Sequence, residues 1–374
     1  ALNLYIGEAY FEKDDYVRAS NYYKLYLADA KGNTDRNVLF RIGYVQMTLE
    51  DENQAIHSFK KVAIVDDTLG YIASYYLGNL YVKQGNKNYA LAAYKVSKDH
   101  SFDAVLEEES LFQYARVCLD IGNFDEAVKS IQEYKSRYPG SSRTQNIDEI
   151  LTEAYLNSKN YDLAISHIEG MKYRSGRINR AYQQITFFKG TELFNDKKFY
   201  AAIQMFDKSL QHPLSNSFVV KAQYWRGEAF SIGLKYQEAK NAYDAVMKSD
   251  IDASSTEYLP ARYGLAYSCF NLKQYGEALD HFRFYLDGIN NPKHPTYLDA
   301  LVRLGDCYYA TKQYQAALEV FDRVIGIDRE KADYCYFRKG VVYGIMGNLK
   351  SANVNFDKVI AEYPDSRHLP NTLY

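Results

Sequence analysis

The chain has 374 residues, of which 47% are hydrophobic and 25% are charged; these proportions are typical of a folded protein and exclude a disordered polypeptide. Its 45 basic and 47 acidic side chains nearly cancel, so the charge disfavours nucleic acid as a partner. The sequence has no run of about eighteen apolar residues, so we expect no direct membrane insertion.

The first predicted element is a helix, because the opening stretch "ALNLYIGEAYF" already shows helical spacing of apolar residues. The stretch has no initiator Met and no basic-then-apolar signal segment. We therefore expect the chain to be a fragment of a longer polypeptide, and its start gives no direct evidence about targeting.

A pattern that begins in this first helix recurs ten times along the chain, at intervals of 35 to 39 residues. Each unit has a small residue at one position: Gly7, Gly43, Gly78, Ala115, Thr152, Gly190, Gly227, Ala266, Gly305 and Gly340. Twelve residues after each small residue comes an alanine. Four residues after that alanine comes a bulky apolar residue: Tyr23, Phe59, Tyr94, Ile131, Ile168, Phe206, Tyr243, Phe282, Phe321 and Phe356.

Each unit predicts two amphipathic helices, because apolar residues around the small residue and around the alanine follow helical spacing. Turn signals such as "IGNFDEA" and "MGNLKSA" lie between the two. The small residue and the alanine would let the helices approach closely, and the bulky residue would fill the gap against the next unit. Since one pair cannot bury both of its faces, stacked neighbours are needed. The pattern therefore predicts an all-α fold without a sheet.

Gly305, Tyr308, Ala317 and Phe321, with their counterparts in the other units, resemble the tetratricopeptide repeat. The prolines at Pro139 and Pro364 match the proline that ends this repeat. The resemblance implies a right-handed α-solenoid superhelix of antiparallel helix pairs in one continuous array. The implied repeats are approximately 1–34, 35–70, 71–106, 107–143, 144–181, 182–218, 219–257, 258–296, 297–331 and 332–366, followed by the start of a further repeat at 367–374.

The sequence offers little for catalysis or metal binding. Its four cysteines lie in different units without Cys-x-x-Cys spacing, and its seven histidines form no helical pair. Phosphate-binding glycine motifs and the Gly-x-Ser-x-Gly motif of hydrolases do not occur. We therefore expect cysteines that fill the core, no catalytic residues, no metal site and no cofactor.

The family resemblance also implies a binding surface, since the first helix of each tetratricopeptide repeat lines a concave groove that holds a protein or peptide. Residues at two positions, three before and one after the small residue, would face it, and in the ninth unit Val302, Asp306 and Tyr309 are expected on its exposed side. Packing between helices is the alternative role for the aromatic rings. The implied groove residues are Phe40, Tyr44, Tyr75, Asn79, Phe112, Arg116, Phe187, Tyr224, Glu228, Tyr263, Tyr267, Asp306, Tyr309 and Phe337.

The segment "MKYRSGRINR" between the fifth and sixth units is the densest cluster of like charge. It contains Lys172, Arg174, Arg177 and Arg180. Such a cluster predicts either a docking site for an acidic partner or phosphate, or a solvated connection.

Together these features favour a non-enzymatic scaffold or adaptor that binds a partner protein or peptide. The stretches "EYKSRYPGSS" and "IAEYPDSRHLPN" resemble repeats of bacterial envelope proteins, including outer-membrane assembly lipoproteins and the Tol-Pal coordinator, which implies the periplasm. Four free cysteines argue against an oxidising compartment, so the cytoplasm is the alternative. A regulatory or sensor module, with its DNA-binding or catalytic domain outside this chain, is a second hypothesis. An accessory segment of an enzyme is a third.

Overall fold

The computed structural model describes residues 2–30, 34–100, 103–249, 256–329 and 332–372. These residues form 21 α-helices and no strand, so the predicted all-α class is confirmed. The chain divides into two compact parts, each made of several repeats, which we call unit 1 (residues 1–181) and unit 2 (residues 182–374). The division falls inside α11 (Gly176–Asn195). Among the described helices, none is both long and apolar enough to cross a membrane.

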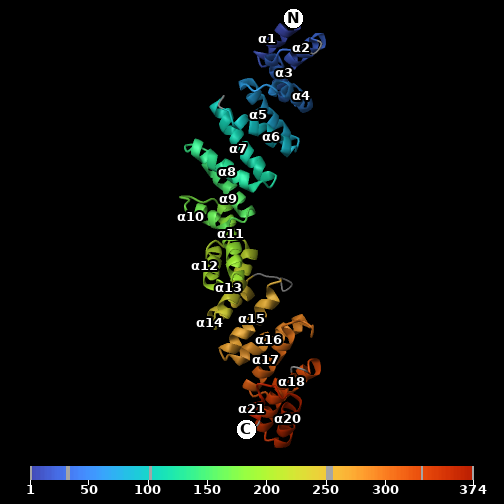
Figure 1. The fold of residues 1–374 in the computed structure, drawn as a ribbon, viewed down its shortest axis with the longest axis vertical. Coiled ribbons are helices and arrows are strands. Elements are labelled where there is room, and N and C mark those ends of the chain that lie inside the picture. Colours follow the sequence, from blue (N-terminus) through green and yellow to red (C-terminus); the bar gives the residue numbers. More distant parts are fainter. Residues whose placement is uncertain (1, 31–33, 101–102, 250–255, 330–331, 373–374) are drawn as a thin grey trace. The chain divides into compact units, whose positions relative to one another are not determined.

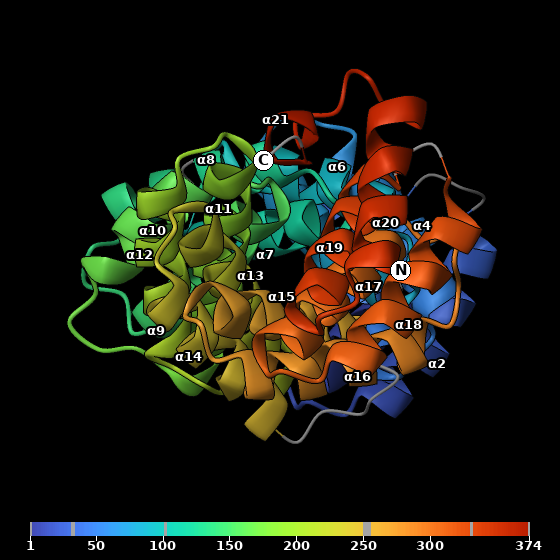
Figure 2. The ribbon, with the colours of Figure 1, turned by 90° about the horizontal axis from the view of Figure 1, so that it is seen from below.

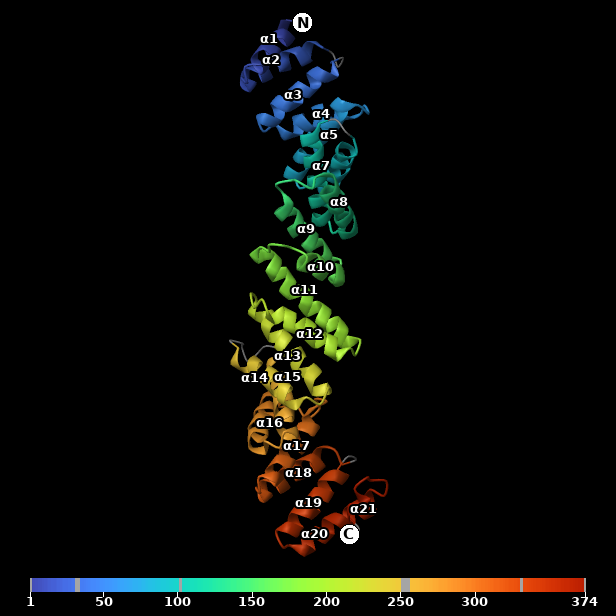
Figure 3. The same ribbon diagram turned by 90° about the vertical axis from the view of Figure 1, so that its left-hand side faces the viewer.

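Within each unit the helices follow one another in chain order and pack as consecutive pairs (Figures 1 and 3). Unit 1 contains α1 (Leu2–Phe11), α2 (Tyr16–Asp29), α3 (Arg36–Thr48), α4 (Glu52–Ala63), α5 (Thr68–Lys83), α6 (Lys87–Lys98), α7 (Ala104–Asp120), α8 (Phe124–Arg137), α9 (Thr144–Asn157) and α10 (Tyr161–Glu169). Unit 2 contains α12 (Phe199–Leu210), α13 (Asn216–Ile232), α14 (Tyr236–Lys248), α15 (Tyr258–Asn271), α16 (Tyr275–Ile289), α17 (Tyr297–Ala310), α18 (Tyr314–Ile327), α19 (Asp333–Ile345), α20 (Leu349–Glu362) and α21 (Leu369–Thr372).

Several first helices begin before the boundary that the repeat pattern gives. Helix α5 begins at Thr68 rather than at residue 71, and α7 begins at Ala104 rather than at residue 107. The side chain of Asp67 accepts a hydrogen bond from Gly70 N at 2.8 Å, and that of Asp103 accepts from the backbone two and three residues on. These aspartates cap the helices, and a cap lies outside the pattern of small and bulky residues that set the predicted boundary.

The turn inside every helix pair has one residue in the left-handed conformation, always seven positions after the small residue. Only three of the ten are glycines. The ten are Asp14, Glu50, Gly85, Gly122, Lys159, Lys197, Leu234, Lys273, Lys312 and Gly347. A glycine in the sequence marks the turn in three pairs. The other seven pairs close the same turn with a residue whose side chain makes the left-handed conformation unfavourable.

In the seven pairs whose small residue is a glycine, the bulky residue of the same pair packs on that glycine. A Cβ placed on Gly305 would lie 2.6 Å from Cε1 of Phe321, and one on Gly227 would lie 2.6 Å from Cε1 of Tyr243. We expected the bulky residue to fill a gap against the next pair. That expectation is incomplete, because the residue also packs against the first helix of its own pair. Tyr243 makes both contacts, because a Cβ on Gly264 of the next pair would meet the same ring.

The first helices of successive pairs touch one another, and we call the surface that they share in each unit its inner face. In unit 1, α3 contacts α5, α5 contacts α7 and α7 contacts α9; in unit 2, α13 contacts α15 and α15 contacts α17. Figure 2 shows α13, α15, α17 and α19 inside α14, α16, α18 and α20. Side chains on the first helices therefore line the inner face.

Candidate functional site

The predicted groove aromatics are held by packing within their own repeats. Seven repeats have an aromatic residue three positions before the small residue. In six of them its ring contacts the bulky ring of the same pair, with ring centroids 5.6 to 6.4 Å apart. Phe112, whose pair has Ile131 at the bulky position, contacts Tyr134 at 6.2 Å instead. The six others are Phe40, Tyr75, Phe187, Tyr224, Tyr263 and Phe337. Phe112 and Phe187 are buried, and the other five rings keep a partly exposed edge.

Four residues that lie one after a small residue reach across to the next repeat, namely Glu8, Tyr44, Tyr267 and Asp306. Each contacts the residue two before the next small residue. Glu8 forms an ion pair with Arg41 in this way, and the ring of Tyr44 meets that of Tyr76 edge-on at 5.9 Å. We call such contacts between successive first helices the inner-face pairs.

Asp306 belongs to an inner-face pair and is not exposed. Its carboxylate lies 3.0 Å from Nε of Arg338, accepts a hydrogen bond from Arg303 at 3.1 Å and accepts another from Tyr334 at 2.7 Å. Only 5% of the Asp306 surface is accessible, so the expectation that it lies on an exposed groove side is wrong. The reason is that Arg338, from the next repeat, covers it. The same guanidinium stacks over the ring of Tyr309 at 4.1 Å.

Tyr267 and Asn79 are likewise engaged. Burial lowers the pKa of Arg303 in the next repeat, but its interaction with Tyr267 raises it, so these two side chains form another inner-face pair. Asn79 accepts a hydrogen bond from Tyr94 of its own repeat at 2.6 Å. The arginines of these pairs were missed at the sequence level, although their fixed place two before the small residue was visible there.

Unit 1 has a pocket of about 310 Å³ on its inner face. It is lined by Phe112, Arg116, Asn146, Glu149, Ile150, Glu153 and Arg177, which come from α7, α9 and the first turn of α11. The pocket thus joins two predicted groove residues, Phe112 and Arg116, with Arg177 of the basic segment. We call it the inner-face pocket of unit 1.

Of the two arginines in this pocket, Arg177 forms ion pairs within the pocket and Arg116 has none among the described contacts. Arg177 forms ion pairs with Glu153 at 2.8 Å and with Glu149 at 3.6 Å. Arg116 is exposed; its guanidinium lies 5.8 Å from the ring centroid of Phe112, and no ion pair to it occurs among the described contacts. Its charge is therefore available to a ligand beside an apolar ring.

The rest of the basic segment lies elsewhere. Lys172 and Arg174 line a second pocket of about 460 Å³ beside the start of α9, where Lys172 also lies over the exposed ring of Tyr173. Arg180 is exposed on α11. The four basic residues are therefore divided between the loop that follows α10 and the first turns of α11 rather than gathered in one site.

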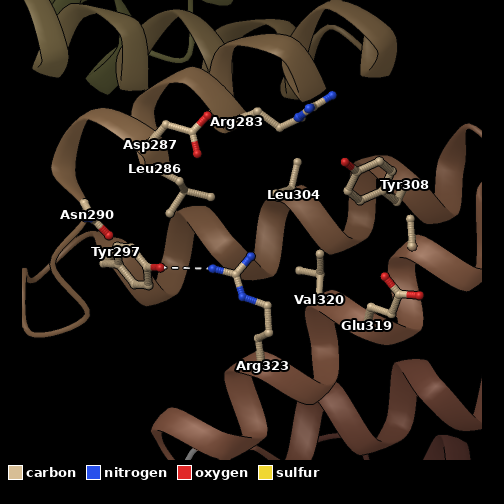
Figure 4. Close-up of a pocket in the computed structure, with 11 residues that line it drawn as sticks. Arg283, Leu286, Asp287, Asn290, Tyr297, Leu304, Tyr308, Glu319, Val320 and Arg323 are labelled. Carbon is tan, nitrogen blue, oxygen red and sulfur yellow. Dashed lines mark hydrogen bonds between the residues drawn. The ribbon is translucent and has the colours of Figure 1, made fainter.

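A further pocket of about 460 Å³ lies in unit 2 and contains no predicted groove residue (Figure 4). Arg283 and Asp287 reach it from α16, and Glu319 and Arg323 reach it from α18. Arg323 donates to the hydroxyl of Tyr297 at 3.2 Å, as the dashed line shows. Sequence analysis missed this pocket because it considered first helices alone, while these four charges belong to second helices.

The four cysteines are buried, and burial raises the pKa of Cys118 to about 11 and that of Cys307 to about 12. Cys269 lies with Glu277 and His281 in one cluster of possible metal ligands, whose ligand atoms are within 4.8 Å of one another. Lys240 already pairs with Glu277 at 2.9 Å. Arg262 lies 2.9 Å from Nδ1 of His281, which can accept its hydrogen bond only when the ring proton is on Nε2. Because Lys240 and Arg262 already place positive charge against Glu277 and His281, these contacts disfavour a metal ion in the cluster.

The two Tyr-Pro-x-Ser stretches have a structural role. After α8, Ser141 donates to Glu108 in the first helix of its own pair at 2.8 Å, and after α20, Ser366 donates to Asp333 at 2.6 Å. The serine thus ties the end of each second helix back to the start of its first helix.

Comparison with protein families shows tetratricopeptide repeats in the chain. Residues 257–330 match one family description of this repeat, and residues 109–141 and 334–366 match another. The matches at 109–141 and 334–366 end at Ser141 and Ser366, the two serines just described. No curated protein matches the sequence.

Several solved structures resemble the chain. A chain of the Naa15/Naa10 complex bound to HypK-THB has 15% identity and a TM-score of 0.46, over 98% of this chain and 64% of that one, so this chain spans less than two thirds of it. YrrB, described as a tetratricopeptide-repeat protein with an unusual peptide-binding site, has 20% identity and a TM-score of 0.43, over 55% of this chain and 93% of that one. PilW, a type IV pilus biogenesis factor, has 15% identity and a TM-score of 0.39, over 63% of this chain and 100% of that one.

Proposed function

We propose that this chain is a non-enzymatic scaffold that binds a partner protein or peptide on its inner face. The observation that carries the proposal is the inner-face pocket of unit 1, which combines the Phe112 ring, the exposed Arg116 and the carboxylates of Glu149 and Glu153. A pocket with charges of both signs beside an apolar ring suits a polypeptide segment, since the charges select side chains of opposite sign.

The test compares two charge reversals in one helix pair. Arg116→Glu changes the inner-face pocket, and Lys129→Glu makes the same change at an exposed position on α8. With the full chain as bait, we expect partners retained by the wild type and by Lys129→Glu to be lost from Arg116→Glu. Retention by all three variants would move binding away from the inner face, and retention of no protein would contradict the scaffold role.

We also propose a location in the bacterial periplasm, at an outer-membrane assembly, and its support is the sequence resemblance of the two Tyr-Pro-x-Ser stretches to envelope repeats. The second candidate is a regulatory or sensor module whose effector domain lies outside this chain. Fractionation of cells that express the full-length protein separates the two. Recovery with the outer membrane supports the first, and recovery in the cytosol together with a DNA-binding or catalytic domain supports the second.

A further inference from the structure

Four acids stand one after the small residue, and an arginine pairs with three of them. Glu153 pairs with Arg177 of α11 at 2.8 Å. Where an acid stands one after the small residue at Glu8 or Asp306, an arginine of the next repeat, Arg41 or Arg338, neutralises it. Glu228 occupies the same position in α13. Its counterpart in the next repeat is Gly264, which has no side chain to offer.

Glu228 has little else to balance its charge. Its described hydrogen bond comes from the hydroxyl of Tyr243 at 2.6 Å, and no cation forms an ion pair with it among the described residues. Burial raises the pKa of this carboxyl, an effect that the Tyr243 hydrogen bond opposes. Glu228 is nevertheless only partly buried, so a ligand can approach it from the inner face.

The chain itself has no room for the missing arginine. A Cβ on Gly264 would lie 2.7 Å from Cε2 and from the hydroxyl oxygen of Tyr243. The glycine therefore lets the tyrosine ring pass and reach Glu228. A hydroxyl satisfies one oxygen of the carboxylate but does not cancel its charge, and Tyr224, one helical turn before Glu228, adds an aromatic edge.

We infer that Glu228 receives the lysine or arginine side chain of a partner segment lying on the inner face of unit 2. The cation that the chain supplies to Glu8 and Asp306 from its own next repeat comes here from the partner. This inference rests on the proposed scaffold function and adds to it the charge of the partner at one position.

The experiment selects phage-displayed random dodecapeptides on the full chain and on two variants. Glu228→Gln removes the charge but keeps an acceptor for the Tyr243 hydroxyl. Glu238→Gln makes the same change at an exposed position on α14 of the same pair. Thermal and urea unfolding of each variant shows that it is folded before selection. Selected peptides are then synthesised with blocked ends and their affinities are measured.

We expect wild type and Glu238→Gln to select peptides with a lysine or arginine at one fixed position, and Glu228→Gln to lose that preference. Replacing this residue of a selected peptide by glutamine should weaken binding to the wild type at least about tenfold and leave binding to Glu228→Gln nearly unchanged. Peptides that bind without a fixed basic position, or whose basic position is indifferent to Glu228→Gln, would overturn the inference while leaving the scaffold function intact. Selection of no peptide by any variant would overturn both.

Discussion

A pair of glycine substitutions in the ninth repeat tests the contact on which the whole repeat pattern depends. Gly305 lies under the ring of Phe321, where an added Cβ would be 2.6 Å from Cε1 and 3.0 Å from Cδ1 and Cζ. Phe321 has 0% exposure, so its ring cannot swing away into solvent. Gly326, in the second helix of the same pair, is exposed and has no atom within 4 Å of its added Cβ.

Alanine at either position gains up to about 1 kcal/mol of helix propensity. At Gly305 the new methyl also overpacks the contact, which costs about 1–3 kcal/mol. Gly326→Ala should therefore stabilise the protein and Gly305→Ala should be neutral to destabilising by about 2 kcal/mol. The difference between the two variants isolates the packing cost.

Hydrogen exchange of amides in α17 and α18 is the suitable measurement, because stacked repeats can open locally without a single global transition. We expect faster exchange in Gly305→Ala and equal or slower exchange in Gly326→Ala. If both variants slowed exchange to the same extent, the glycine would not be a contact point and the assignment of the small residue to the helix crossing would fail.

Three further predictions concern turns, titration and thiols. Leu234 is 70% exposed and has φ of 57°, so Leu234→Gly should relieve left-handed strain and stabilise the protein by about 1 kcal/mol, measured by urea unfolding; a loss of stability would contradict the strain. Burial lowers the pKa of His167, with Lys135 adding to the effect, and burial also lowers the pKa of His281. The unfolded chain then binds more protons, so stability should fall as the pH drops below about 6.5 through the folded pKa values, and His167→Gln should reduce that fall. Cys269 and Cys335, whose pKa values burial raises to about 12, should resist a thiol reagent in the folded protein and react once urea unfolds it; rapid labelling of the native chain would show that they are accessible.

The sequence was sufficient for what depends on regular spacing, and insufficient for what depends on a neighbouring repeat. Ten small residues and ten alanines located ten helix pairs, because a close helix crossing permits few side chains. The early start of α5 was not visible in that spacing, since it depends on the cap made by Asp67. The burial of Asp306 was also hidden, because it depends on Arg338, which lies 32 residues further along the chain.

The same distinction bears on how this surface selects a partner. The aromatic residues that looked suited to a ligand are largely used inside each repeat, where rings such as Phe40 and Tyr263 pack on the bulky ring of their own pair. Charges such as Glu8 and Asp306 are likewise matched by an arginine of the next repeat. No ion pair of Arg116 in unit 1 or of Glu228 in unit 2 occurs among the described contacts, and these two residues have opposite signs and lie beside aromatic rings. Because an unmatched charge near apolar surface rewards an opposite charge and penalises a like one, these two residues should determine specificity more than the aromatic area around them.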